Sequence, residues 1–180
     1  TLSTLYDNNL DILKENDHDI NTAEYPGDKE KEFLKNEIIK VYNVLFKKVN
    51  LWKEALNNQD EEGDDIRREL REHYTILKPF GQRALVKAYL YLKLKYKKRD
   101  GSSFSDSDIC NKFNDINWKL ENEQWRGVMT KSGDRIESGK DNLQLASKLI
   151  CHLCGAKIPE QEGFRDKYEK KAGRGLPKTI

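Results

Sequence analysis

The chain has 180 residues, of which 36% are hydrophobic and 36% are charged, and its formal net charge is +2. No apolar stretch approaches the ~18 residues of a membrane span, and the three cysteines, an odd number, argue against a disulfide-stapled secreted scaffold. We therefore expect one mainly helical domain over residues 1–180, with a small extended or hairpin segment near 116–138 and no membrane partner. Because the sequence starts at Thr1 and not at a Met, we expect it to be a fragment of a longer protein.

Charge is distributed unevenly along the sequence. Residues 1–65 carry 16 acids and 8 bases, a net charge of −8, whereas residues 66–180 carry 15 acids and 25 bases, a net charge of +10. Such asymmetry is typical of a surface that meets nucleic acid, or of two halves that attract each other. The densest basic run extends from Lys87 to Arg99 without an acid, and a second run lies between Arg165 and Lys178.

The pattern of apolar residues in the first half predicts three helices. Leucines and Tyr6 at helical spacing indicate a short amphipathic helix over residues 1–13. After a polar loop with a Pro26-Gly27 turn signal, steps of three and four residues predict a long helix from Asp28 to Trp52. The acidic segment 57–65 predicts a loop, after which a helix resumes from Asp65 to Tyr74.

The second half also predicts mostly helix. Pro79 is expected to start a new helix, residues 116–138 alternate as short extended arms do, and Gly155 is a natural helix stop. The expected helices cover residues 79–98, a short stretch from Ser105 or Ser107 to Phe113, residues 140–154, and a final basic helix within 159–171.

Few sequence motifs indicate a catalytic or metal-binding site. Cys151 and Cys154 form a C-x-x-C pair that could hold zinc with Cys110 and His152, but their apolar helical setting equally fits small buried core residues. Their place near a helix C-terminus disfavours redox catalysis, because the helix dipole there opposes a thiolate. His73 has no evident Ser or Cys nucleophile as a partner. We expect no catalytic residue, metal or cofactor in this chain.

The basic run is the candidate for contact with nucleic acid. Lys93 and Lys97 are four residues apart and share a face of the expected helix, as phosphate contacts require. A solvated helix end, where cations are favoured by the macrodipole, explains the same run. Trp118 and Trp125 are interpreted as core anchors rather than base-stacking platforms. The predicted DNA-binding residues are Lys93, Lys97, Lys98, Arg99, Arg126 and Arg135.

Two sequence blocks resemble a known family. Residues 116–127 read I-N-W-K-L-E-N-E-Q-W-R-G, and residues 68–81 contain an Arg followed by His73 and then Gly81. These blocks resemble the C-terminal region of the DGQHR-domain family, whose DndB-like members belong to the DNA phosphorothioation (sulfur-modification) system. The DGQHR signature itself does not occur, and Asn117 stands where that family usually has Asp. The resemblance thus implies a helical C-terminal module without its N-terminal DGQHR domain.

The resemblance implies a cytoplasmic, DNA-binding regulatory or accessory protein associated with sulfur modification, with DNA as partner and a possible homo-oligomer. An alternative is the structural helical part of a DNA-modifying or nucleotide-processing enzyme whose active site lies in a missing N-terminal domain. A protein–protein scaffold, in which acidic and basic halves of different chains dock, is a third interpretation.

Overall fold

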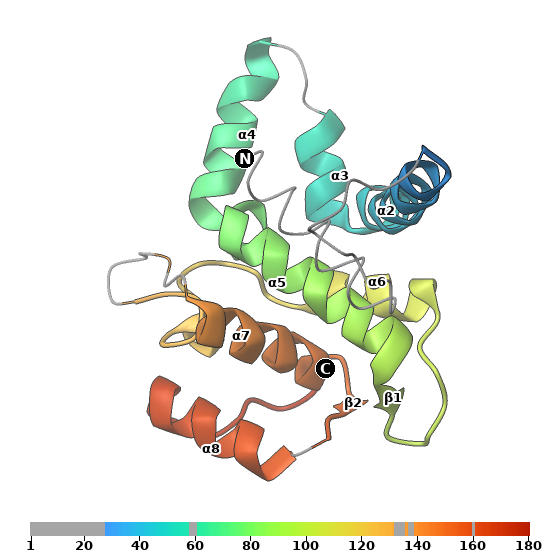
Figure 1. Ribbon diagram of the computed structural model, residues 1–180. Coiled ribbons are helices and arrows are strands. Elements are labelled where there is room, and N and C mark those ends of the chain that lie inside the picture. Colours follow the sequence, from blue (N-terminus) through green and yellow to red (C-terminus); the bar gives the residue numbers. More distant parts are fainter. Residues whose placement is uncertain (1–27, 58–60, 132–135, 137–138, 160) are drawn as a thin grey trace.

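A computed structural model of the chain describes residues 28–57, 61–131, 136, 139–159 and 161–180 (Figure 1). The structure is mainly helical and contains a two-stranded antiparallel sheet, so the expected fold class is confirmed. The helix expected over residues 1–13 and the Pro26-Gly27 turn lie outside the described residues.

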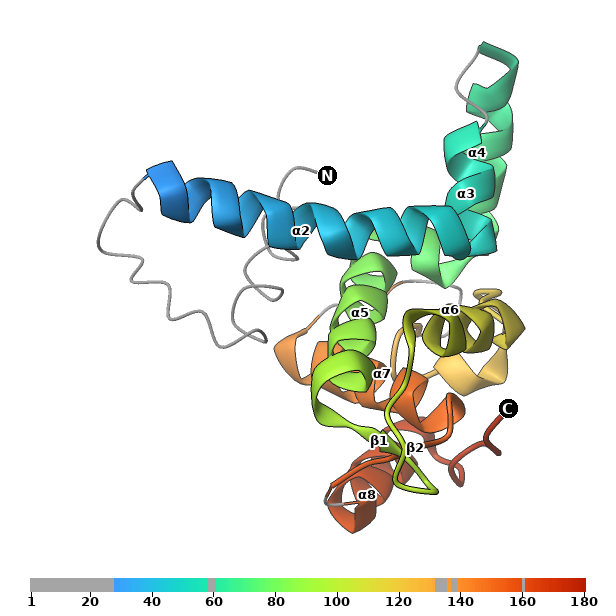
Figure 2. The same cartoon turned by 90° about the vertical axis from the view of Figure 1, so that its right-hand side faces the viewer.

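The helix expected from Asp28 to Trp52 is two helices, α2 (Asp28–Lys48) and α3 (Asn50–Asn57). The side chain of Asn114 stabilises the corner between them. Its amide nitrogen donates to the Lys48 carbonyl at 2.9 Å, and its amide oxygen accepts from the Asn50 backbone at 2.9 Å. Figure 2 shows the result, a long α2 that crosses above α5 and α7, with α3 rising from its end beside α4.

Helix α4 (Glu61–His73) runs back beside α3 and begins earlier than the sequence pattern predicted. Part of the supposed acidic loop 57–65 is therefore helical. The physical reason is that acids at the first turn of a helix interact favourably with the positive end of its dipole. A 3-10 turn η1 (Thr75–Leu77) then leads into α5.

The helix expected over residues 79–98 ends early. It comprises α5 (Pro79–Leu90) and a π-helical turn η2 (Tyr91–Lys95), after which the backbone is extended. The Tyr96 amide bonds the Tyr91 carbonyl at 2.7 Å, and the two rings lie 5.4 Å apart. Strand β1 (Lys97–Lys98) then pairs with β2 (Ala156–Lys157). Lys93 and Lys97 therefore do not share a helical face, and that prediction is wrong.

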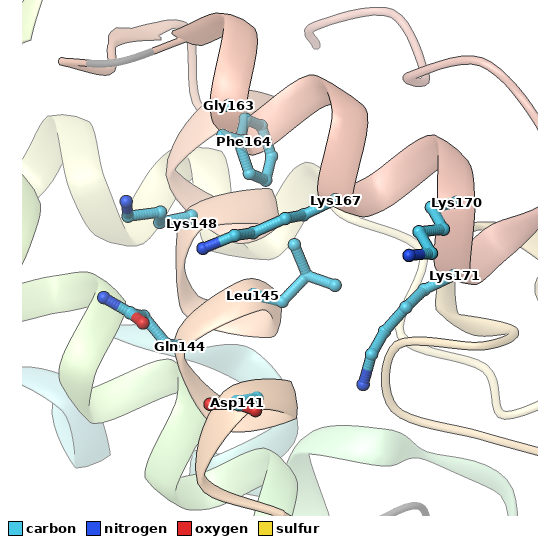
Figure 3. Close-up of a pocket in the computed structure, with 9 residues that line it drawn as sticks. All are labelled: Asp141, Gln144, Leu145, Lys148, Gly163, Phe164, Lys167, Lys170 and Lys171. Atoms are coloured by element: carbon cyan, nitrogen blue, oxygen red, sulfur yellow. The ribbon is translucent and has the colours of Figure 1, made fainter.

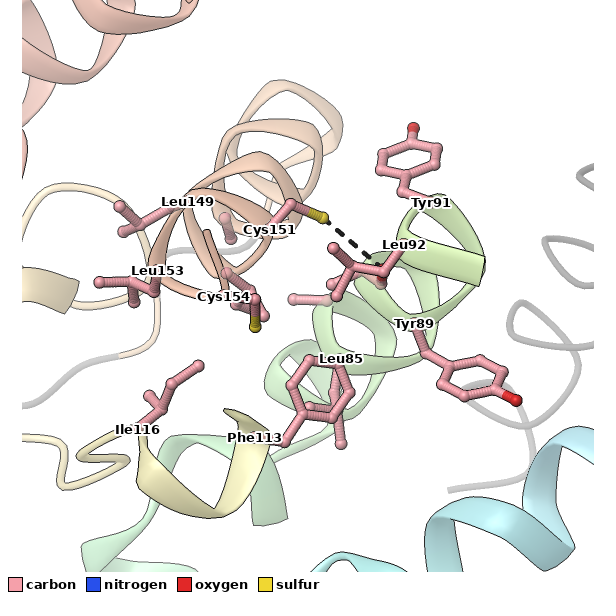
Figure 4. Packing of buried hydrophobic residues seen from close by; sticks show 14 of the residues in the cluster. Leu85, Tyr89, Tyr91, Leu92, Phe113, Ile116, Leu149, Cys151, Leu153 and Cys154 are labelled. Carbon is pink, nitrogen blue, oxygen red and sulfur yellow. Dashed lines mark hydrogen bonds between the residues drawn. The ribbon is translucent and has the colours of Figure 1, made fainter. Parts of the chain in front are cut away.

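The main core lies between α5 and α7 (Lys140–Leu153), which pack closely along their lengths (Figure 4). Small residues permit the close approach, since Ala84, Ala88 and Ala146 are fully buried. Helix α7 agrees with the predicted range 140–154, and Gly155 ends it with a φ of +82°. The expected final helix is also present as α8 (Gln161–Ala172), which packs on α7.

Helix α6 (Asp106–Asp115) confirms the expected short helix, and of the two candidate caps, Ser105 and Ser107, it is Ser105 that caps it. The Ser105 hydroxyl accepts from the Asp108 backbone at 3.1 Å, and the Asp108 carboxylate accepts from the Ser105 backbone at 3.0 Å. This reciprocal capping box fixes the start of α6 beside the end of α5.

Residues 116–131 form an irregular segment of turns and isolated bridges around a 3-10 turn η3 (Glu123–Trp125). Isolated bridges join Tyr74 to Lys119 and Thr130 to Ile136, whereas the two-stranded ladder is formed by β1 and β2. The rings of Trp118 and Trp125 stack at 5.2 Å with an interplanar angle of 5°, and both are buried. Their interpretation as core anchors is confirmed.

Candidate nucleic-acid interface

Two of the predicted DNA-binding lysines are held by acids of α6. Lys93 forms a 2.7 Å ion pair with Asp106, and Lys98 forms a 3.0 Å ion pair with Asp108. The Tyr89 hydroxyl also donates to the Asp106 carboxylate, at 2.9 Å. These contacts connect the end of α5 and β1 to the first turn of α6, so both lysines stabilise a junction between elements.

These contacts lower the pKa of the Asp106 and Asp108 carboxyl groups. Burial alone would raise the pKa of Asp106, but hydrogen bonds from Lys93 and Tyr89 outweigh it, and the pKa lies below its ordinary value. The Ser105 backbone bond, followed by the Lys98 bond, lowers the pKa of Asp108 to about 2. Both carboxylates are therefore ionised at neutral pH and neutralise their lysines.

Lys97 and Arg99 belong to a different group of cations, which surrounds the ladder. Lys97 lies directly opposite Lys157 in the antiparallel register, and both side chains are exposed. Burial is the main cause that lowers the pKa of His152, and the nearby charges of Arg99 and Arg165 lower it further. We call Lys97, Arg99, Lys157 and Arg165 the ladder patch. Within the described part of the chain, none of the four forms a salt bridge with an acid.

Arg126 is not brought to this patch. Arg126 forms a 3.4 Å ion pair with Glu123 in the segment beside the C-terminal end of α8, where Arg174 donates to the Arg126 carbonyl. The ladder adjoins the other end of α8, because β2 precedes that helix by a few residues. Arg135 lies outside the described residues.

A second cationic site lies in a groove between α7 and α8 (Figure 3). Its volume is about 500 Å³, and Leu145 and Phe164 lie at its floor. Four lysines and one acid line it, namely Lys148, Lys167, Lys170, Lys171 and Asp141. Three of the lysines belong to the basic run noted in the sequence, whereas Lys148 was not singled out. The sequence indicates this face of α7 through residues at three- and four-residue steps, namely Asp141, Gln144, Leu145 and Lys148.

The cysteines lie in the core. Cys151 donates to the Ala88 carbonyl at 3.6 Å, and burial raises its pKa well above the ordinary value (Figure 4). Burial likewise raises the pKa of Cys110, to about 11, and that of Cys154 further. His152 donates from its Nε2 to the Pro177 carbonyl at 2.9 Å. Over the described ranges, no group of three or more His, Cys, Asp or Glu side chains is placed to hold a metal ion.

The described helices include none with the length and apolar character needed to cross a membrane. Comparisons of the chain with protein-family models, with curated proteins and with solved structures find no match.

Proposed function

We propose that this chain is a helical DNA-binding accessory module whose ladder patch contacts the phosphate backbone. The observation that carries the proposal is the pairing of Lys97 with Lys157 across the ladder. Like charges directly opposite each other in an antiparallel pair destabilise it, and no acid of the described residues neutralises this pair. A ligand with closely spaced negative charges relieves the repulsion on binding.

Duplex DNA has the charge spacing that such a patch requires. One phosphate occurs per ~1.7 Å of helix axis when both strands are counted. Lysine and arginine contacts to phosphates release condensed counterions, so the affinity falls steeply with salt. Contacts of this kind position a protein on DNA without reading its sequence. We therefore expect binding through the ladder patch to be tolerant of DNA sequence.

The resemblance to the DGQHR-domain family supports a more specific proposal, an accessory role in DNA sulfur modification. The two blocks that carry the resemblance lie against each other, because the Leu120 amide donates to the His73 carbonyl and the Thr75 amide to the Trp118 carbonyl, each at 2.8 Å. The side-chain oxygen of Asn117 accepts a hydrogen bond from the Lys119 backbone at 3.1 Å. An Asp carboxylate at this position accepts the same hydrogen bond.

The test is duplex binding by fluorescence anisotropy between about 50 and 200 mM salt. The double variant Lys97→Glu and Lys157→Glu is compared with Lys35→Glu and Lys53→Glu. The control pair makes the same change in net charge at exposed positions on α2 and α3. Each duplex is prepared with and without phosphorothioate linkages.

We expect the ladder variant to lose at least tenfold in affinity at low salt and to show a shallower salt dependence. The control pair should change the affinity several times less. Equal losses in both variants would mean that net charge, and not the ladder patch, attracts DNA. Equal affinity for modified and unmodified duplexes would separate DNA binding from recognition of the modification.

A further inference from the structure

We infer that the groove between α7 and α8 is a binding site for a small phosphorylated ligand of nucleotide size. Its volume of about 500 Å³ lies within the range of small-molecule sites. This inference goes beyond DNA binding and does not depend on it, because the groove and the ladder patch share no residue.

The helical spacing of α8 separates its charges into two faces. Successive helical residues are about 100° apart. Phe164 and Tyr168 are buried, which defines the inner side of α8. Lys167, Lys170 and Lys171 fall to one side of the buried pair and line the groove, whereas Arg165 and Glu169 fall to the other side. Asp166 lies on the outer face, opposite the buried pair, and does not line the groove. The groove side of α8 thus presents cations without acids.

Helix α7 supplies the opposite wall. Lys148 lies one turn after Gln144 and lines the groove. Figure 3 shows Lys167 reaching from α8 towards α7, with Lys148 on the α7 side. Four lysines against Asp141 leave a net charge of +3. Lys171 also donates to the Asn142 side chain, whereas no salt bridge within the described part of the chain occupies Lys148, Lys167 or Lys170. Several unpaired ammonium groups around one cavity suit a ligand with two or more phosphates.

The floor of the groove favours a ligand that also has an apolar portion. Leu145 and Phe164 lie there, and the aliphatic stems of the lysines extend the apolar wall while their charged ends remain in water. A nucleoside diphosphate combines a flat base with closely spaced negative charges. An inorganic polyphosphate provides only the charges and has no apolar portion to contact the lysine stems.

Gly163 supports the assignment independently. It is the third residue of α8 and lines the groove, and a Cβ added there would meet no atom within 4 Å. Packing therefore does not require glycine at this position, although glycine in a helix is less favourable than alanine. The missing side chain leaves the end of the groove open, which is useful to a ligand and unfavourable for the helix.

The test is isothermal titration calorimetry of the whole chain with ADP, tripolyphosphate, adenosine and a hexaglutamate peptide. The groove variant is Lys148→Gln with Lys167→Gln, which leaves the Lys171 hydrogen bond intact. Lys97→Gln with Lys157→Gln is the matched control, because it removes the same charge from the ladder patch. Thermal unfolding without ligand verifies that each variant is folded.

We expect ADP to bind more tightly than tripolyphosphate, and adenosine and hexaglutamate to bind at least tenfold more weakly than ADP. The groove variant should lose at least tenfold in ADP affinity and retain DNA binding, whereas the control should do the reverse. Absence of ADP binding, equal binding of hexaglutamate, or an equal loss in both variants would overturn the inference. Tripolyphosphate binding as tightly as ADP would overturn the nucleotide assignment.

Discussion

Two regions of the molecule differ in how their residues are used. The first is the motif block, residues 68–81 and 116–127, in which both tryptophans are buried and the side chains of Asn117 and Asn122 accept hydrogen bonds from the backbone. Trp118 donates to the Phe113 carbonyl at 2.6 Å and Trp125 to the Asn117 carbonyl at 2.9 Å. The second comprises the ladder patch and the groove, where exposed cations lack acidic partners among the described residues.

A segment with a distinctive sequence is therefore not the same as a surface that is available for binding. The spacing of tryptophans and glycines in the motif block follows from packing. A Cβ at Gly127 would lie 2.4 Å from the Lys171 carbonyl oxygen, and its φ is +78°. Surface lysines have no such constraint and form no distinctive motif. We therefore expect changes in the motif block to reduce stability, and changes in the cationic regions to reduce binding.

Trp125→Ala should have the largest effect. Trp125 is fully buried and stacks on Trp118, so its truncation leaves a cavity and is expected to cost about 3–5 kcal/mol in the free energy of unfolding. Urea denaturation followed by circular dichroism measures the loss. The folded fraction should bind DNA with unchanged affinity. A loss of affinity without a loss of stability would place Trp125 at the binding surface instead.

Two glycines at the same helical position should respond in opposite directions. A Cβ at Gly81, the third residue of α5, would lie 1.9 Å from the Thr75 carbonyl oxygen. Gly81→Ala is therefore expected to cost about 1–3 kcal/mol or more. Gly163→Ala, at the third residue of α8, should instead stabilise the chain by up to about 1 kcal/mol. Thermal unfolding compares them, and destabilisation by Gly163→Ala would show that glycine there is needed for folding.

The sequence predicted the elements whose determinants are local. Helix α7 agrees with its apolar periodicity and with the stop at Gly155, and α6 agrees with its Ser105 cap. Two of the errors occur where distant residues decide. The corner between α2 and α3 depends on the Asn114 side chain, and the end of the helical segment after Lys95 depends on pairing with residues 156–157. Asn114 and residues 156–157 are distant in sequence from the segments that they alter, so the local sequence does not indicate these contacts.

Contacts between distant residues also limited the prediction of the candidate site. The basic run identified Lys97 and Arg99, but charge density did not reveal that Asp106 and Asp108 neutralise Lys93 and Lys98. Lys157 joins the patch only through strand pairing. The groove was missed because its walls are two helices, and no pattern within one of them shows that the other lies opposite.

Removing the repulsion across the ladder should separate stability from function. Lys157→Thr eliminates the like-charged pair with Lys97 and introduces a residue suited to a strand. We expect a gain of about 0.2–1 kcal/mol in the free energy of unfolding, which decreases with added salt. DNA affinity should fall in the same variant. In a double-mutant cycle with Lys97→Thr, the second change should gain less than the first, and strict additivity would show that the two charges do not interact.

The smallest expected effect concerns the pKa of His152, a buried residue near Arg99 and Arg165 of the ladder patch. Burial lowers the pKa of this imidazole, and the charges of Arg99 and Arg165 lower it further, against the opposing hydrogen bond with the Pro177 carbonyl. The unfolded chain has a histidine pKa of about 6.5. The neutral ring therefore stabilises the fold fully above that pH, and the contribution is lost as the pH falls through 6.5 towards the lower folded value.

Arg165→Gln should raise the pKa of His152 only part of the way to its ordinary value, because burial remains the larger cause. Phosphates bound at Arg99 and Arg165 should raise it in the same direction, since they offset the same positive charges. A histidine titration by NMR, with and without duplex DNA, measures both shifts. If Arg165→Gln moves the pKa and DNA does not, DNA does not approach Arg165. The buried imidazole thus reports on occupancy of the patch without any change to the patch itself.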